Sequence, residues 1–246
     1  MLARRTAVLA YGAVVYLIAL ITFLFTVGFL ADAVVPKGVN DGVTGPVWLA
    51  VFVDVVLLSL FAVQHSVMAR SWFKRRLTRL VAPSAERSTY VLATSLVLAL
   101  AMWQWRPIPD QLWSVQNGVA RAALWIVYCA GWAVLFLATI QIGHLDMFGI
   151  KQVLARARER AYAEPAFGTP FLYRLVRHPI MVGFLIAFWA TPDMSVGRLV
   201  FVGTATAYIL VGVRFEERDL RRQLGGAYER YLTEVPGYVP RLQRSA

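Results

Sequence analysis

The sequence predicts an all-α, polytopic integral membrane protein. The expected fold is a helical bundle with five to six transmembrane helices, the last two forming a short hairpin, followed by an amphipathic helix on the cytoplasmic side. Hydrophobic residues make up 59% of the 246 residues, and the mean hydropathy is +0.58, both far above the average for water-soluble domains. Long apolar runs also alternate with short basic stretches. We therefore expect residues 1–246 to form a single membrane domain, with four spans in 1–142 and a second half in 143–246.

Three apolar runs are long enough to cross a hydrocarbon core of roughly 30 Å. They cover residues 8–30, 48–68 and 122–142. The run 88–105 is shorter and holds Gln104 near its end. The last two runs, 179–190 and 199–213, are separated only by residues 191–198, so they are either short spans or a hairpin that enters the membrane without fully crossing it.

The positions of Lys and Arg predict the orientation of these spans, because basic residues collect in short cytoplasmic loops. With six spans and the N-terminus inside, the basic residues fall at Arg4 and Arg5 and in 70–87, 143–178 and 214–246. Four of the 25 Lys and Arg residues lie elsewhere: Lys37, Arg106, Arg121 and Arg198. Both termini of this multi-pass protein are therefore expected in the cytoplasm.

The net charge of +11 does not indicate a nucleic-acid partner. The basic residues are divided among juxtamembrane loops and form no single stripe, as expected where loops meet anionic lipid headgroups. The expected partner is therefore membrane lipid, and no obligate protein partner is evident. The single cysteine, Cys129, permits no intrachain disulfide.

The C-terminal tail has the pattern of an amphipathic helix that begins inside the last span. Apolar and aromatic side chains recur at helical spacing between residues 216 and 231: Leu220, Leu224, Tyr228 and Tyr231. The pair Gly225-Gly226 weakens the middle of this helix, and Pro236 and Pro240 end any helix beyond it.

A possible anion site lies at the start of the run 179–190. Pro179 suits the first position of a helix, and the unpaired amides of the next three residues, beside the Arg177 guanidinium, form a natural receptor for a carboxylate or phosphate. Gly183 allows another backbone or a flat ligand to approach closely. The alternative is that Arg177 and His178 simply anchor a helix at the headgroups.

Two adjacent carboxylates, Glu216 and Glu217, lie at the cytoplasmic end of the last span. Charge is costly there unless a polar or cationic group pairs with it. They can pair with Arg214 or Arg218, or they can bind an ammonium group or ribose hydroxyls. S-adenosylmethionine supplies both groups, and also a carboxylate for the Arg177 site, but the spacing alone does not decide between these readings.

The segment 177–240 resembles the C-terminal signature of the isoprenylcysteine carboxyl methyltransferase-like (NnrU-related) membrane superfamily. The resemblance implies S-adenosylmethionine as the cofactor. It also implies a cofactor site built from Arg177, His178, Pro179, Gly183, Glu216, Glu217, Tyr228 and Tyr231. Two positions depart from the family pattern: Met181 stands where tyrosine is frequent, and Leu224 where phenylalanine is frequent. These departures affect the acceptor pocket more than the cofactor site.

The rest of the chain is similar to the bacterial methanethiol S-methyltransferases. The similarity lies in residues 64–70 (QHSVMAR), 86–90 (ERSTY), 103–107 (WQWRP), 144–149 (HLDMFG) and 187–192 (AFWATP). It implies methylation of a small thiol, methanethiol to dimethyl sulfide, in the bacterial inner membrane. It also implies that Gln64 and Met181 lie at the acceptor.

Methyl transfer from a sulfonium to a thiol requires alignment, a thiolate and exclusion of water, and it needs no metal. His144, with Asp146 two residues on, or His65 beside Gln64 is expected to accept the thiol proton. His178 is expected to shape the cofactor site. The topology places these three histidines, the only ones in the chain, at the same membrane face. For each of them the alternative is an interfacial hydrogen-bonding role.

Three rival functions remain open at this point. A methyltransferase of the same superfamily can act on a larger lipidic or isoprenylated thiol or carboxylate. A haem or metal protein can use bis-histidine ligation, although the histidine spacing fits no compact metal motif. A nonenzymatic membrane scaffold explains the basic loops, but leaves the Arg177 and Glu216 motifs without a purpose.

Overall fold

The computed structural model describes the backbone of residues 2–240 and the side chains of residues 6–240. The basic side chains of Arg4, Arg5, Arg241 and Arg244 lie outside the described residues. The chain divides into two compact units that are interleaved in sequence. Unit 1 contains Met1–Trp113, His144–Glu164 and Met194–Thr204, and unit 2 contains Ser114–Gly143, Pro165–Asp193 and Ala205–Ala246. This division differs from the expected one at residue 142, because the third long apolar run belongs to unit 2.

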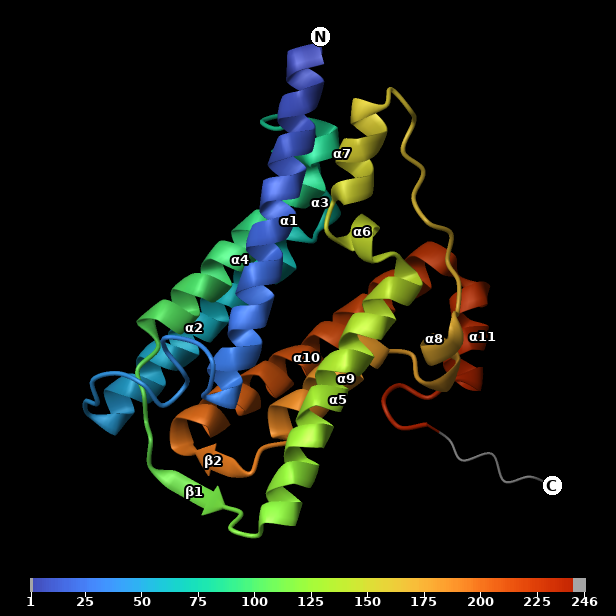
Figure 1. Cartoon of the computed structure of the whole chain (residues 1–246). Coiled ribbons are helices and arrows are strands. Elements are labelled where there is room, and N and C mark those ends of the chain that lie inside the picture. Colours follow the sequence, from blue (N-terminus) through green and yellow to red (C-terminus); the bar gives the residue numbers. More distant parts are fainter. Residues whose placement is uncertain (1, 241–246) are drawn as a thin grey trace, which may run out of the picture. The chain divides into compact units, whose positions relative to one another are not determined.

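Unit 1 is built around long helices that pack side by side. Helix α1 lies against α4 and α7, and α2 lies against α4 (Figure 1). A Cβ atom added at Gly12 would lie 2.6 Å from the Val153 side chain, so this glycine sets how closely α1 and α7 approach. The elements of unit 1 are α1 (Leu2–Ala31), α2 (Val47–Met68), α3 (Ser71–Leu77), η1 (Pro83–Ala85), α4 (Glu86–Gln104), α6 (His144–Met147), α7 (Ile150–Ala157) and the start of α10 (Val196–Leu224).

Unit 2 is organised by the close packing of α5 (Gly118–Ile142) on α9 (Pro179–Trp189) (Figure 1). A Cβ atom at Gly131 would lie 2.5 Å from the Ala187 nitrogen, and one at Gly183 would lie 2.7 Å from the Gly131 oxygen. Only glycine permits this approach of two backbones. The close approach expected at Gly183 is therefore to another helix. The remaining elements of unit 2 are α8 (Phe171–Leu175), the end of α10 and α11 (Gly226–Glu234).

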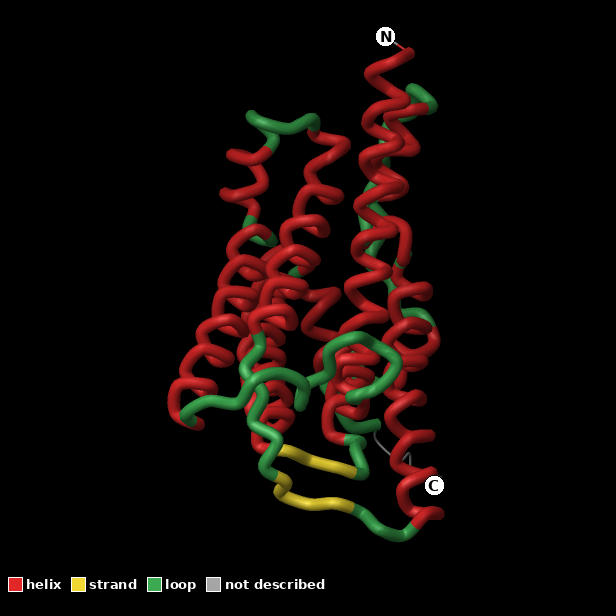
Figure 2. The backbone as a smooth tube through the Cα atoms, turned by 60° about the vertical axis from the view of Figure 1, so that its left-hand side comes forward, coloured by secondary structure: helices red, strands yellow, loops and turns green. Residues whose placement is uncertain are grey.

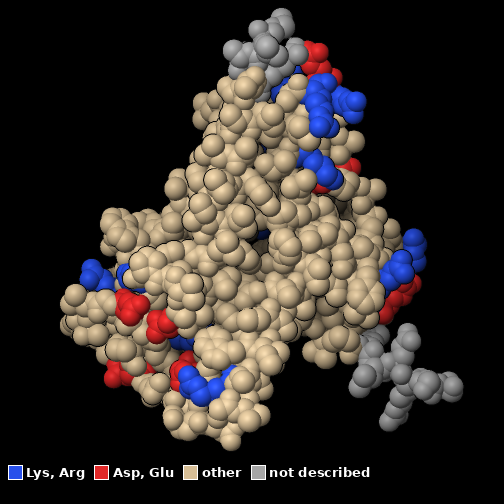
Figure 3. Space-filling model, in the orientation of Figure 1, with Lys and Arg blue, Asp and Glu red and all other residues tan. Residues whose placement is uncertain are grey.

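The structure confirms an all-α polytopic membrane protein. Among the described residues, four helices are long and apolar enough to cross a membrane: α1, α2, α5 and α10. Helix α9 has 11 residues and reaches only about 17 Å, so it does not cross alone. The expected short hairpin therefore consists of a short α9 and a long α10. On the face shown in Figure 3, charged residues form small groups between broad uncharged areas.

The amphipathic tail is two helices and not one. Helix α10 continues to Leu224, and α11 begins at Gly226. Gly225 between them has a φ of +55°, a left-handed conformation that glycine adopts readily and that interrupts the helix. The expected stripe still forms one apolar cluster: Tyr228, Tyr231 and Val235 pack with Leu220, Leu224 and Leu232. Helix α11 ends at Glu234, shortly before Pro236, as the prolines predict.

A two-stranded sheet that the sequence did not predict joins β1 (Gln111–Ser114) and β2 (Asp193–Ser195), the yellow strands of Figure 2. Strands this short carry no clear alternation of apolar and polar residues. The buried carboxylate of Asp54, in α2, fixes the chain just before β1, where its Oδ1 accepts a 2.9 Å hydrogen bond from the Arg106 amide. Asp54 thus has a structural contact with the turn that ends α4.

Candidate functional site

The centre of the candidate site in unit 2 is the ion pair between Arg177 and Glu217. Arg177 immediately precedes the His178-Pro179 start of α9, and Glu217 lies in the last third of α10. The Glu217 Oε1 atom accepts hydrogen bonds from Nη2 and Nε of Arg177, at 2.8 and 3.0 Å. Both side chains are only 15% exposed, so the pair is held in a poorly solvated position. Glu217 therefore uses Arg177 as its partner, and not the neighbouring arginines considered from the sequence.

Arg177 also fastens the C-terminal segment to the start of α9. Its Nη1 donates to the carbonyl oxygens of Leu232 and Val235, and its backbone amide donates to the Pro236 oxygen at 2.8 Å. Nε and both terminal nitrogens of the guanidinium thus have protein acceptors. The expectation that this guanidinium receives a ligand anion is not what the structure shows, because the tail folds back and supplies carbonyls to it. The Val182 amide also bonds within the helix, to the His178 oxygen at 3.0 Å.

His178 lies between the two carboxylates and is 6% exposed. Its Nε2 is 3.0 Å from Oε1 of Glu217, and its Nδ1 is 3.6 Å from Oε2 of Glu216. The ring lies beside that of Tyr238, with centroids 5.9 Å apart. The histidine therefore joins the acidic pair to the tail, and it shapes the site as the sequence indicated.

Glu216 differs from Glu217 because its side chain is 50% exposed. Two buried phenol hydroxyls, those of Tyr173 and Tyr228, have no hydrogen-bond partner among the described residues. Burial raises the pKa of Tyr228 to about 12, and the nearby Glu217 and Glu216 carboxylates raise it further. Burial, and then the charge of Glu216, also raise the pKa of Tyr173. Both phenols therefore stay protonated and can donate to a ligand held beside Glu216.

Tyr231, in contrast, has a structural contact. Its hydroxyl donates to the Tyr173 carbonyl at 2.6 Å, which ties α11 to the end of α8. Pro179 occupies the first turn of α9 and is buried, and Met181 follows it in the same helix, half-buried. Of the expected cofactor residues, six are joined in one cluster: Arg177, His178, Glu216, Glu217, Tyr228 and Tyr231. Gly183 faces α5 instead.

His144 and Asp146 lie in unit 1, on the short helix α6, and have separate partners. Nε2 of His144 is 3.1 Å from the Tyr16 hydroxyl. Asp146 Oδ1 accepts from the Tyr162 hydroxyl at 3.1 Å, and Oδ2 is 2.5 Å from Lys151 Nζ. The expectation that Asp146 orients His144 is therefore wrong for the described contacts, because α6 directs the two side chains to different neighbours. Burial lowers the pKa of His144, which favours its neutral form.

His65 lies on α2, among aromatic residues of unit 1. The Tyr90 hydroxyl is 2.9 Å from its Nε2, and the Phe61 ring stacks on it with centroids 5.5 Å apart. Gln64 donates to the Met68 sulfur at 3.0 Å. Because Tyr90 and Met68 belong to a buried cluster with Val15, Ala19 and Val91, these contacts connect His65 and Gln64 to the core.

Sequence reasoning missed the tyrosines that contact these groups. Tyr16 and Tyr90 occur in helical apolar runs, where tyrosine is ordinary packing, and Tyr173 lies in a short helix that no periodicity reveals. Their partners are distant in sequence, so no local spacing indicates the pairs. Among the described residues, no three His, Cys, Asp or Glu side chains come together in a way that could hold a metal ion.

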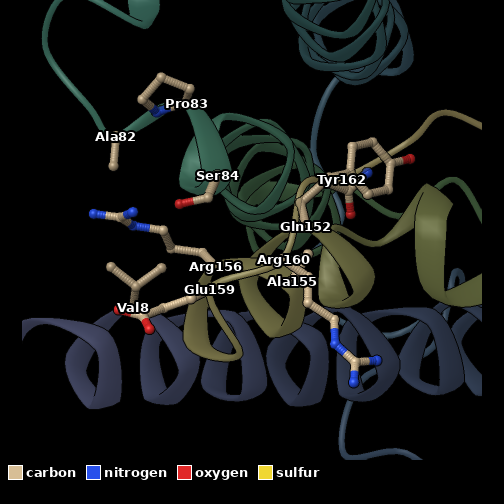
Figure 4. A pocket seen from close by; sticks show the side chains of 10 residues that line it. All are labelled: Val8, Ala82, Pro83, Ser84, Gln152, Ala155, Arg156, Glu159, Arg160 and Tyr162. Carbon is tan, nitrogen blue, oxygen red and sulfur yellow. The ribbon is translucent and has the colours of Figure 1, made fainter. Parts of the chain in front are cut away.

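A cavity of about 790 Å³ lies elsewhere in unit 1, and none of the expected site residues lines it. Figure 4 shows its wall formed by α1, the η1 segment, α7 and the residues that follow α7. The lining is mixed, with apolar Val8 and Pro83 near the charged Arg156 and Glu159. The cavity is therefore distinct from both groups of candidate residues.

The fold and the charged cluster define a polytopic helical membrane protein with a polar site near its C-terminus. The family described as "NnrU protein" matches residues 54–235, and the chain belongs to this family. A "Methanethiol S-methyltransferase" from Mycobacterium tuberculosis is 48% identical over 237 residues, which cover 96% of this chain and 97% of the relative. A protein of the same name from Pseudomonas sp. (strain GM41(2012)) is 48% identical, covering 96% of this chain and 91% of the relative.

More distant similarity extends to animals. "Nurim" from Danio rerio is 30% identical over 213 residues, covering 78% of this chain and 74% of the relative. No solved structure is significantly similar to the chain.

Proposed function

We propose that this protein is an S-adenosylmethionine-dependent thiol S-methyltransferase that converts methanethiol to dimethyl sulfide. The observation that carries this proposal is the similarity to relatives with that name, which are 42–48% identical to the chain over most of its length. Such identity over the whole membrane region, and not only over the C-terminal motifs, favours a small thiol over the larger lipidic acceptors.

The residues of unit 2 fit the proposed cofactor. When bound, S-adenosylmethionine supplies an electrophilic methyl group on a sulfonium. The half-exposed Glu216 carboxylate would accept hydrogen bonds from an ammonium group or from ribose hydroxyls. The buried hydroxyls of Tyr173 and Tyr228 would gain the partner that they lack among the described residues. Arg177, His178 and Glu217 would hold this surface in place through their contacts with the tail.

His144 is the residue of unit 1 proposed to take the proton of the thiol. A general base must be unprotonated at the working pH, and burial lowers the pKa of this histidine. The surrounding helix residues would exclude water, which keeps the thiolate reactive. Asp146, paired with Lys151 and Tyr162, would stabilise the segment that carries His144. His65 and Gln64, with their core contacts, would support the fold near the acceptor.

The proposed setting is the bacterial inner membrane, with both termini in the cytoplasm. Four helices long enough to span a bilayer support a membrane location. The basic loops at 70–87 and 143–178 support the orientation, because such loops remain on the cytoplasmic side. The proposed partners are the thiol, the cofactor and membrane lipid, with no nucleic acid.

A thiol panel tests the proposed reaction. Purified protein in detergent or nanodiscs would be incubated with S-adenosylmethionine and either methanethiol, longer alkyl thiols or a prenylated cysteine, and volatile sulfides would be measured in the headspace. We expect dimethyl sulfide from methanethiol and a declining rate with longer thiols. Turnover confined to prenylated cysteine would replace this proposal with the lipidic alternative.

A further inference from the structure

Tyr16 and His144 form a side-chain pair that joins α1 to α6 within unit 1. The phenol oxygen of Tyr16 is 3.1 Å from Nε2 of His144, although the residues are 128 positions apart. The two rings meet edge to face, with centroids 5.8 Å apart and an interplanar angle of 89°. Phe148 contacts both rings, at 4.7 Å from His144 and 5.6 Å from Tyr16. The imidazole is therefore oriented by one hydrogen bond and two aromatic contacts.

The second tyrosine–histidine pair of unit 1 provides a comparison. Tyr90 bonds to His65 with a similar distance, 2.9 Å, but Tyr90 is 7% exposed and belongs to the buried core cluster. Tyr16 and His144 are both half-buried, so a small solute can reach them. The same chemical pair thus occurs once inside the core and once near the surface of the unit.

Nearby charged groups are engaged with other partners. Asp146 pairs with Lys151, and Arg87 donates to the Met147 carbonyl at 2.7 Å. The Tyr11 hydroxyl, one helical turn before Tyr16, is bonded to Thr89 at 3.0 Å. The printed contact between His144 and a polar side chain is therefore the one with Tyr16.

The Tyr16 oxygen is suited to stabilise a protonated His144. A protonated imidazole carries hydrogen on both nitrogens, so it donates from Nε2 to the phenol oxygen. This charge-assisted bond is stronger than the bond that the neutral ring makes with the same hydroxyl. Tyr16 therefore makes the ring a better proton acceptor, and acts against the burial that disfavours its charged form.

We propose that Tyr16 is a positioning residue for the acceptor-activating step: its hydroxyl orients His144 and stabilises the protonated ring formed when His144 takes the proton of the thiol. In this step the S–H bond breaks, an N–H bond forms on His144, and the electron pair remains on sulfur as a thiolate. The inference rests on the proposed function, since it assigns a role within that reaction. It distinguishes His144 from His65 as the base.

Two matched variants test the inference through the pH dependence of kcat/KM for methanethiol. Tyr16→Phe removes the hydroxyl that bonds His144, and Tyr90→Phe removes the equivalent hydroxyl at His65. We expect Tyr16→Phe to lower the plateau of kcat/KM about tenfold and to move its acid limb to lower pH by on the order of half to one unit. Tyr90→Phe should keep the parental acid limb. An unchanged limb in Tyr16→Phe, or an equal shift in both variants, overturns the inference.

Histidine NMR provides a readout that does not need turnover. Because the chain contains three histidines, 15N-histidine labelling gives few signals, and His65→Gln and His144→Gln assign them. The pKa of His144 should fall in Tyr16→Phe and stay constant in Tyr90→Phe; the opposite pattern contradicts the inference. If the parent makes no dimethyl sulfide, the proposed function fails. If the parent is active and the His144 pKa is unaffected by Tyr16→Phe, the inference alone fails.

Discussion

Replacing Glu217 by glutamine should loosen the C-terminal tail. Oε1 of Glu217 accepts two hydrogen bonds from Arg177 and contacts His178 at 3.0 Å. Glutamine keeps the shape but removes the charge, which leaves the Arg177 guanidinium, 15% exposed, without its counter-ion. Breaking a poorly solvated ion pair in this way costs about 3 kcal/mol. Since Arg177 also holds the carbonyls of Leu232 and Val235, this loss should appear as local opening of α11.

Hydrogen–deuterium exchange measures this opening directly. A cost of about 3 kcal/mol corresponds to roughly 100-fold faster exchange of α11 amides, whereas amides of α5 should exchange at the parental rate. Glu229→Gln is the control, because its contact with Arg221 spans 3.5 Å between side chains that are 48% and 59% exposed, and such surface pairs contribute little. Parental exchange of α11 in Glu217→Gln would refute the view that this ion pair anchors the tail.

Three further predictions concern the cofactor, the packing and the base. Glu216→Gln should weaken S-adenosylmethionine binding by about 1–3 kcal/mol, measured by calorimetry, while α11 exchange stays parental, because this carboxylate is half-exposed and lies outside the anchor. Gly183→Ala should lower the thermal midpoint, because its Cβ would lie 2.7 Å from the Gly131 oxygen, whereas Gly212→Ala, with nothing within 4 Å, should not lower it. His144→Ala should reduce turnover by ~10²–10⁴ and recover at high pH, where the thiol ionises in solution; a parental rate throughout would show that His144 is not the base.

The membrane spans could be predicted from sequence because their length and apolar character are local properties. Helices α1, α2 and α5 cover the three long apolar runs, and Gly225 interrupts the tail where the glycine pair weakened the expected helix. The division into two units could not be predicted in this way. It depends on the contact of Gly131 with Gly183, which only the packing of two distant helices creates.

The candidate site shows the same limit. The sequence identified Arg177 and Glu217 as important residues, but it did not pair them, because their contact spans 40 residues. It also assigned Asp146 to His144 from a spacing of two residues, although α6 directs Asp146 toward Lys151. Spacing therefore identified the reactive side chains, and tertiary packing selected their partners.

One labelling measurement tests the central claim most directly. Purified protein would be incubated with methanethiol and S-adenosylmethionine carrying an isotopically labelled methyl group, and the headspace would be analysed by mass spectrometry. The proposed function predicts dimethyl sulfide that carries the label, with the signal lost in Glu216→Gln at a cofactor concentration that is limiting for this variant. Absence of labelled dimethyl sulfide from active, cofactor-binding protein would contradict it.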